Sequence, residues 1–180
     1  MEKLSMQQLN RMTVEEFKTT EKTPLIVVLD NVRSALNVGS VFRTSDAFRL
    51  EKIILGGITA CPPNNEIRKT AIGAEQSMEW EYAKDTVAAV QDLKSQGYTI
   101  IAVEQADESV MIDELDLSGI QKAALVFGNE VKGVDDRIMD ICDLCAEIPQ
   151  FGTKHSLNVS VSAGIAIWEF FKKIRAKNAQ

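Results

Sequence analysis

The stretch that decides the fold is AEIPQFGTKHSLNVSVSAGIAIWEFF, residues 146–171. It predicts a strand that stops at Pro149, then a polar loop, then a strongly apolar helix over 157–173. Where a loop becomes a helix, free backbone N–H groups and the positive helix end favour anionic or hydrogen-bonding ligands. Ser156 and Asn158 stand at that junction, so they are either caps of the helix or part of a site built on a rigid element.

Outward from this stretch, the chain alternates strands with helices. LIVVLD at 25–30 is a continuous apolar run, typical of a strand buried on both faces. Further strands are predicted at 52–56, 98–105, 123–128 and 144–149, and helices at 38–48, 85–96 and 134–141, with a shorter one within 66–74. The alternation predicts an α/β fold, a mostly parallel sheet with helices on both faces. Ligands of such sheets bind at the carboxyl ends of the strands.

The amino-terminal region is predicted to be a short helical extension, residues 1–22. Residues 2–18 predict one or two short helices, and Thr13 with Glu16 forms a capping-box pattern. Pro24 is expected to end this region. No apolar run reaches the roughly 18–20 residues of a membrane span, and the first residues lack the apolar core of a secretory signal. We therefore expect a single domain over 1–180 that works in the cytoplasm without a membrane.

Composition agrees with an ordinary globular domain. The 180 residues are 45% hydrophobic and 26% charged, and the three cysteines, an odd number, argue against a disulfide framework. The net charge of −6 is unevenly spread, because residues 75–119 hold eleven acids and two lysines. That segment carries −9, which leaves +3 for the rest of the chain. Total charge therefore does not exclude an RNA partner, nor does it indicate one.

Two more polar loops follow predicted strands. The first is NVRSALNVGSVFRTSDAF, 31–48, in which Asn37 is a candidate helix cap and Arg43 lies at the edge of the buried face. A guanidinium placed there takes a planar anion or a carboxylate of its own chain. The second is LVFGNEVKGVDD, 125–136, in which Gly128 permits close approach of a ligand. It matches neither the dinucleotide fingerprint nor the phosphate loop of nucleotide triphosphatases.

Together the three stretches resemble the three motifs of the SpoU (TrmH-like) family of RNA 2′-O-ribose methyltransferases, of the SPOUT class. Their order and spacing agree, and the resemblance covers residues 24–175. It implies a carboxyl-terminal trefoil knot, S-adenosylmethionine as cofactor, a homodimer, and a tRNA or rRNA substrate. Gln150 stands where the family often has Met, and Val134-Asp135 replaces a frequent Leu-Ser, departures that bear on substrate choice more than on activity.

The resemblance also implies the site residues. The catalytic set is Arg43, Asn37, Glu130, Ser156 and Asn158. The cofactor set is Phe127, Gly128, Asn129, Ile148, Ser156 and Leu157, with Asn158 and Val159 as weaker members. For RNA we expect the basic residues Arg33, Arg43, Arg49, Arg68, Lys69 and Lys154, and by family analogy Lys3 and Arg11. A solvated surface charge is the alternative for most of them.

Other readings of the chain are weaker. Cys142 and Cys145 form a lone C-x-x-C which, with Cys61 and the only histidine, His155, reaches four conceivable zinc ligands. One C-x-x-C is weak evidence, so we expect no metal. VVLD at a strand end is also found in receiver domains, but the paired acids that such a module needs are absent. The main alternative is a protein of the same fold that binds RNA without catalysis.

Overall fold

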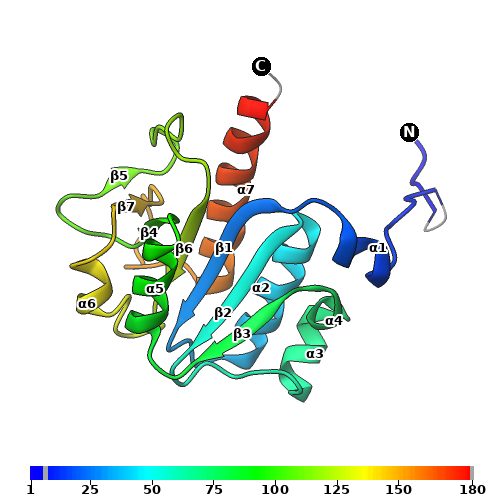
Figure 1. The fold of residues 1–180 in the computed structure, drawn as a ribbon, viewed down its shortest axis with the longest axis horizontal. Helices are drawn as coiled ribbons and strands as arrows, with labels where there is room; N and C mark the ends of the chain where they lie inside the picture. The colour runs from blue at the N-terminus through cyan, green and yellow to red at the C-terminus, as the bar shows by residue number, and fades with distance from the viewer. Residues whose placement is uncertain (6–7, 179–180) are drawn as a thin grey trace.

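The computed structural model describes residues 1–5 and 8–178, with side chains described through Arg175. Figure 1 shows a sheet with helices on both faces. The helices and strands, in chain order, are α1 Val14–Thr19, β1 Thr23–Asp30, α2 Ala35–Ala47, β2 Leu50–Gly56, α3 Asn65–Ala71, α4 Ala74–Ser77, β3 Trp80–Ala83, α5 Thr86–Ser95, β4 Thr99–Val103, β5 Val110–Met111, β6 Ala123–Phe127, α6 Asp136–Met139, β7 Leu144–Glu147 and α7 Val159–Asn178.

The strands form one seven-stranded sheet in the order β3-β2-β1-β6-β4-β7-β5, and every neighbouring pair is parallel. β1 is central: Val27 pairs with Ile53 of β2 on one side and with Leu125 of β6 on the other. Parallel pairing brings the carboxyl ends of the strands to one edge. The predicted α/β architecture is confirmed, and β3 and β5 are two short strands that the sequence pattern did not predict.

Two apolar layers sandwich the sheet. Alternate residues of β1 point to opposite faces, so Val27 joins one core while Val28 joins the other. The first core packs against α2 and α7, through residues such as Phe42 and Phe170, and the second packs against α5 and α6. Burial of each such side chain contributes roughly 1.5–3 kcal/mol. These layers hold rigidly the strand ends from which the loops emerge.

The amino-terminal capping box is confirmed. The Thr13 side chain accepts a hydrogen bond from the Glu16 N–H at 3.2 Å, and the Glu16 carboxylate accepts one from the Thr13 N–H at 2.8 Å. Within the described residues this region forms one helix, α1, which buries Phe17; the part of the prediction that concerns residues 6–7 lies outside them.

Two predicted boundaries were wrong. Pro24 does not precede β1 but lies inside it, where the register with β2 shifts and a missing N–H is tolerated. The cap of α2 is Ser34 rather than Asn37, since the Ser34 side chain accepts a hydrogen bond from the Asn37 N–H at 3.3 Å. The helix therefore starts a turn earlier than predicted, which leaves the Asn37 side chain available for other contacts.

Candidate active site

A hollow of about 760 Å³ lies at the carboxyl ends of β4, β6 and β7. Its walls come from three stretches far apart in the sequence: the end of β4 at 103–105, the loop after β6 at 127–134, and the segment at 148–159 that leads into α7. Eight of the lining residues are apolar: Val103, Phe127, Val131, Val134, Met139, Ile148, Leu157 and Val159. The rest are polar or glycine, the mixture that small-molecule sites present.

All six predicted cofactor residues line this hollow, as do Asn158 and Val159. The loop at 128–133 is closed on itself, since Asn129 and Gly133 exchange backbone hydrogen bonds at 2.9 Å. A Cβ at position 128 would lie 2.0 Å from the carbonyl carbon of Gly133, so only glycine permits this approach. Gly133 itself has a φ of +73°, which glycine adopts without strain.

Glu130 ties the loop after β6 to the start of α2. Its carboxylate accepts hydrogen bonds from the N–H of Arg33 at 2.8 Å, from the N–H of Ser34 at 3.0 Å and from the Asn37 amide at 3.4 Å. Burial raises the pKa of Glu130, but these donors outweigh it and hold the pKa below its ordinary value. The carboxylate thus stays ionised at neutral pH while it satisfies free N–H groups beside a helix N-terminus.

The same network extends into the third stretch. The Asn158 amide donates to the Asn37 side-chain oxygen at 3.2 Å, and the Asn158 oxygen accepts from the Ser160 N–H at 2.9 Å. Asn158 therefore caps α7 and contacts α2 at once. Predicted catalytic residues from all three sequence stretches, Asn37, Glu130 and Asn158, form one hydrogen-bonded chain.

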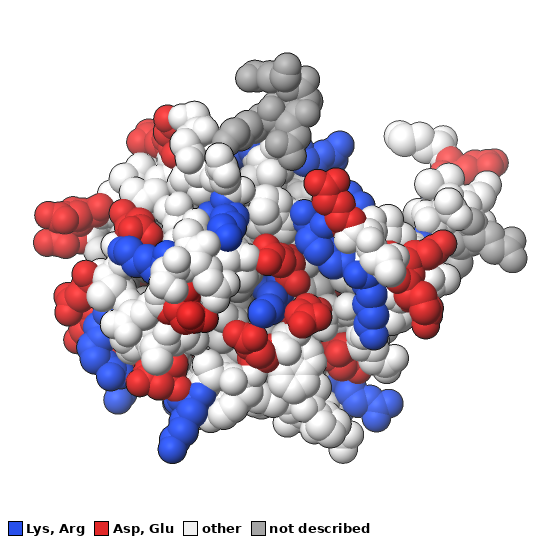
Figure 2. Space-filling view, viewed as in Figure 1, with Lys and Arg blue, Asp and Glu red and all other residues white. Residues whose placement is uncertain are grey.

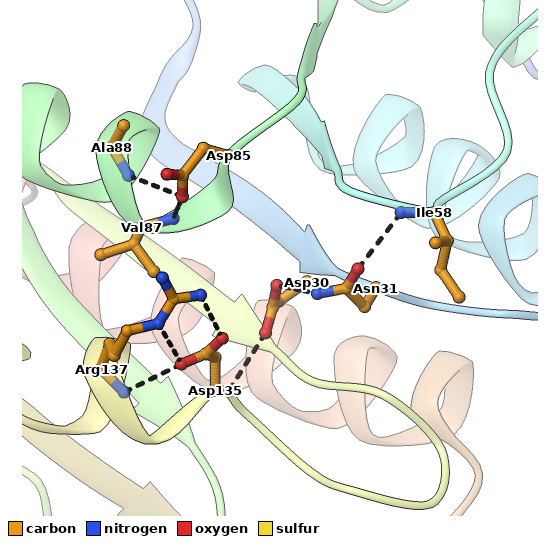
Figure 3. Close-up of polar contacts among 8 residues, drawn as sticks. All are labelled: Asp30, Asn31, Ile58, Asp85, Val87, Ala88, Asp135 and Arg137. Atoms are coloured by element: carbon orange, nitrogen blue, oxygen red, sulfur yellow. Dashed lines mark hydrogen bonds and ion pairs between the residues drawn. The ribbon is translucent and has the colours of Figure 1, made fainter.

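A buried carboxylate supports these loops from behind. Asp30, 2% exposed, accepts hydrogen bonds from the Asn31 amide at 2.8 Å and from the Asp135 N–H at 3.1 Å (Figure 3). Asn31 in turn accepts from the Ile58 N–H at 3.2 Å, and its carbonyl accepts from the Asn129 amide at 2.7 Å. The end of β1 thereby fixes the loops that follow both β2 and β6.

Asp30 was not among the predicted site residues. The sequence could have indicated Asp30, because it is a carboxylate directly after an apolar run. A charge buried at such a position is costly unless it accepts hydrogen bonds from backbone N–H groups. The lining residues Val103, Glu104 and Gln105 were also missed. Their signal was the polar pair that ends the predicted strand at 98–105.

Arg43 does not line the hollow of its own chain. It is exposed on α2, along a stripe with Leu36, Ser40 and Ala47, and within the described part of the chain its side chain makes no hydrogen bond or ion pair. The carboxylate of its own chain that the sequence left open as a partner is therefore not seen there. Ser156 lines the hollow close to Asn158.

The predicted RNA-binding residues are scattered. Arg33 and Lys154 lie in the first and third stretches and are exposed, and Arg68 is exposed on α3. Lys69 pairs with Glu66 at 2.5 Å. Arg49 precedes β2 and therefore lies at the amino end of the strands, away from the hollow. On the face that carries α5 and α6, acidic and basic side chains are interspersed without a patch of one sign (Figure 2).

The cysteines and histidine do not come together. In residues 1–5 and 8–178, no group of three or more His, Cys, Asp or Glu side chains is placed to hold a metal ion. Burial raises the pKa of the Cys145 thiol to about 11, so this thiol is protonated at neutral pH. His155 stands exposed on the wall of the hollow. No helix of the described chain has the length and apolarity to cross a membrane.

Known proteins are similar to this chain in sequence and in fold. The chain is 32% identical over 155 residues to the 23S rRNA (guanosine-2′-O-)-methyltransferase RlmB of Neisseria meningitidis, which covers 86% of this chain and 61% of that protein. It is 30% identical over 151 residues to the tRNA (guanosine(18)-2′-O)-methyltransferase TARBP1 of Mus musculus, covering 83% of this chain and 9% of that one. The chain therefore spans less than two thirds of either relative.

Solved structures agree. The TrmH/SpoU tRNA modifying enzyme of A. aeolicus superposes with a TM-score of 0.81 at 29% identity, over 92% of this chain and 82% of that one. The AdoMet-bound rRNA methyltransferase of Sinorhizobium meliloti superposes with a TM-score of 0.78 at 28% identity, over 84% of this chain and 57% of that one. The model of the SpoU rRNA methylase family matches residues 24–168, which contain all three stretches around the hollow, and the chain belongs to this family.

Proposed function

We propose that this chain is an S-adenosylmethionine-dependent RNA methyltransferase that methylates a ribose 2′-hydroxyl of tRNA or rRNA. One observation carries the proposal: two of the three stretches that resemble the family's motifs line a single hollow, and the first stretch is joined to both of them through Asn37, which contacts Glu130 and Asn158. Support comes from the relatives, which are named as 2′-O-methyltransferases of rRNA and tRNA, and from the related structure named as AdoMet-bound.

The residues of the hollow fit this cofactor. Apolar side chains of Val103, Phe127, Ile148 and Leu157 suit the faces of an adenine ring, and the backbone at 128–134 offers polar groups to the sugar. Glycine at position 128 lets this wall fold back on itself, since a Cβ there would collide with the backbone of Gly133. S-adenosylmethionine supplies a methyl group on a positively charged sulfur, so the donor is already activated.

The protein must then align the RNA hydroxyl and assist loss of its proton. Alignment can supply a large part of the acceleration, and the network through Asn37, Glu130 and Asn158 is suited to it because its hydrogen bonds tie the three stretches to one another. Glu130 uses its oxygens on backbone N–H groups. We therefore assign it the role of holding the start of α2 in place, rather than that of a general base.

We assign Arg43 to the hollow of a partner subunit. An exposed arginine without a partner in its own described chain, on a helix beside α7, is suited to reach across an interface. A guanidinium keeps its proton up to a pH of about 12, so Arg43 does not serve as the base. It instead binds the adjacent phosphate and stabilises the negative charge that develops on the ribose oxygen, while the phosphate or a water takes the proton.

An apolar stripe on α7 supports the homodimer. Val161, Ile165 and Trp168 are spaced one turn apart, and all three are exposed, Trp168 at 48%. α7 packs against α2, which carries Arg43, and Phe48, the residue that follows α2, packs on the Trp168 ring with 5.8 Å between the ring centroids. Exposed apolar side chains in a row mark an interaction surface, and a two-fold axis there pairs like with like.

Three further features belong to the proposal. The segment at 148–158 threads through the β4–β6 connection to form the trefoil knot, in line with the position of β6 between β1 and β4. Residues 1–180 are one methyltransferase domain with 1–22 as its extension, since α1 packs on α4. The protein works in the cytoplasm, in keeping with three free thiols.

The test combines calorimetry and product analysis. We expect the purified protein to bind S-adenosylmethionine with one site per chain, and to transfer labelled methyl groups to transcripts of tRNA or 23S rRNA. Nuclease digestion should then release a 2′-O-methylated nucleoside. RNA binding without cofactor binding would favour the alternative, a catalytically silent RNA-binding protein of the same fold.

A further inference from the structure

Phe151 is an aromatic ring with nothing packed against it. Its side chain is 98% exposed, more than any other aromatic side chain in the described residues. Trp168, by contrast, packs on Phe48 and on Phe171. Leaving an aromatic ring in water forgoes a large hydrophobic gain, so a ring held out in this way calls for a partner from outside the chain.

The ring belongs to a loop at the mouth of the hollow. Its neighbour Gln150 lines the hollow, and so does the run 155–159 a few residues on. Gly152 follows the ring, and a Cβ there would meet nothing within 4 Å, so the surroundings are open. The loop carries no acid between Glu147 and Glu169. Phe151 therefore stands in free space beside the place where a methyl acceptor must enter.

Three basic side chains lie around this mouth, beside the acidic lining residues Glu104, Glu130 and Asp136. Lys154 lies in the same loop, Lys132 on the opposite wall and Arg33 in the first stretch, and all three are exposed. In the described residues none of the three side chains is in an ion pair with a carboxylate, whereas Lys52, Lys69 and Lys94 are. Val131, 75% exposed, adds an apolar surface next to Lys132. The mouth thus combines bare apolar groups with free cations, in a chain whose net charge is −6.

We propose that Phe151 is a stacking platform for an unpaired nucleobase next to the ribose that is methylated, with Lys154 and Lys132 on the flanking phosphates. This deepens the proposed function, on which it rests, by naming the substrate class as a loop or single-stranded segment of RNA. An aromatic face takes any base, because every base has a π-face, whereas bases inside a duplex are covered by their neighbours. Free cations beside the ring neutralise the phosphates that accompany the base.

The alternative is that the Phe151 ring packs against a partner subunit. The observations favour RNA, because the loop opens at the hollow, carries Lys154 and lies apart in sequence from the apolar stripe of Val161, Ile165 and Trp168 on α7. Lysines beside an aromatic ring suit the regularly spaced phosphates that accompany the bases of RNA.

The first experiment measures binding without relying on activity. Phe151→Ala, Phe151→Leu and Phe151→Tyr are compared with wild type for binding to a short oligoadenylate and to an adenine–uracil duplex, by fluorescence anisotropy. Tyr82→Ala is the matched control, since Tyr82 is a 53% exposed aromatic on β3, at the opposite edge of the sheet. We expect Phe151→Ala and Phe151→Leu to weaken oligoadenylate binding by about tenfold, while Phe151→Tyr and Tyr82→Ala keep wild-type affinity.

Three outcomes would overturn the platform: Phe151→Leu that binds like wild type, equal losses on duplex and single strand, or a monomer where wild type is a dimer in light scattering. A second readout separates this failure from that of the proposed function. If wild type methylates RNA and Phe151→Ala does so with unchanged kcat/KM, the stacking role is wrong and the enzyme assignment stands. If wild type yields no 2′-O-methyl product, the proposed function fails, while the anisotropy series still decides whether Phe151 stacks on a base.

Discussion

In the proposed mechanism, Glu130 organises the site without taking part in the chemistry. Its depressed pKa means that the ionised form is stabilised in the folded chain. That stability is fully present above the unfolded value, near 4.5, and is lost as the pH falls through the lower folded value. We expect the difference in unfolding free energy between wild type and Glu130→Gln, measured by urea denaturation, to be largest above a pH of about 5.

This difference should shrink as the pH falls below the unfolded value, because protonation of Glu130 leaves both forms uncharged at position 130. The effect should be modest, since the carboxylate is partly in contact with water. A difference that grows on acidification would contradict the assignment of Glu130 as a carboxylate held by the N–H groups of Arg33 and Ser34.

Arg43 is the residue on which the mechanism depends. Arg43→Ala should lower kcat by about 100-fold or more, because charge stabilisation at the ribose oxygen is lost. The dissociation constant for S-adenosylmethionine should change little, since Arg43 does not line the hollow of its own chain. Arg43→Lys keeps the positive charge but not the planar fork of the guanidinium, so its kcat should lie between those of wild type and Arg43→Ala. Equal losses in kcat and in cofactor affinity would rule out this role.

At the scale of elements, α7 depends on Asn158 in two ways that can be separated. Asn158→Ala removes the cap and the bond to Asn37, whereas Asn158→Ser keeps a capping oxygen and removes only the bond to Asn37. We expect Asn158→Ala to lower the unfolding free energy by about 1 kcal/mol relative to Asn158→Ser, as measured by chemical denaturation. Both variants should lose turnover. Equal stability of the two would show that the cap contributes nothing to α7.

The helices and strands were largely predictable because burial leaves a periodic pattern. The continuous apolar run at 25–30 and the helical spacing around Phe42 have no other simple explanation. β3 and β5 were missed because edge strands of four and two residues carry too little pattern. The start of α2 was misplaced because Ser34 and Asn37 are both good caps, and only the position of Glu130 decides between them.

The site was predictable in part, and for different reasons. Resemblance located Phe127, Gly128 and Ser156, which line the hollow. The periodic pattern of apolar residues does not say which loops meet in the folded chain. The hydrogen bonds of Asp30 and the wall of the hollow at the end of β4 could therefore be found only once the order of the strands was known. Neither the family resemblance nor the structure of one chain tests the role of Arg43, because that role depends on a second chain.

At the scale of the whole molecule, the proposed role of Arg43 requires a dimer. Trp168→Glu places a charge in the apolar stripe of α7, and we expect it to give monomers in light scattering and to lower methyl transfer as strongly as Arg43→Ala. Circular dichroism should stay unchanged, since the Trp168 side chain is half exposed. Tyr82→Glu is a suitable control, as Tyr82 is a half-exposed aromatic on the edge strand β3. A monomeric Trp168→Glu with full activity would contradict the assignment of Arg43 to a partner's hollow.

The most direct test of the central claim is mass mapping of ribose methylation in total RNA from cells that contain or lack this protein. The account predicts a single 2′-O-methylated nucleotide, in an unpaired segment of tRNA or rRNA, that disappears without the protein and returns with wild type but not with Arg43→Ala. An unchanged set of ribose methylations, or the loss of a methyl group carried on a base instead, would contradict it.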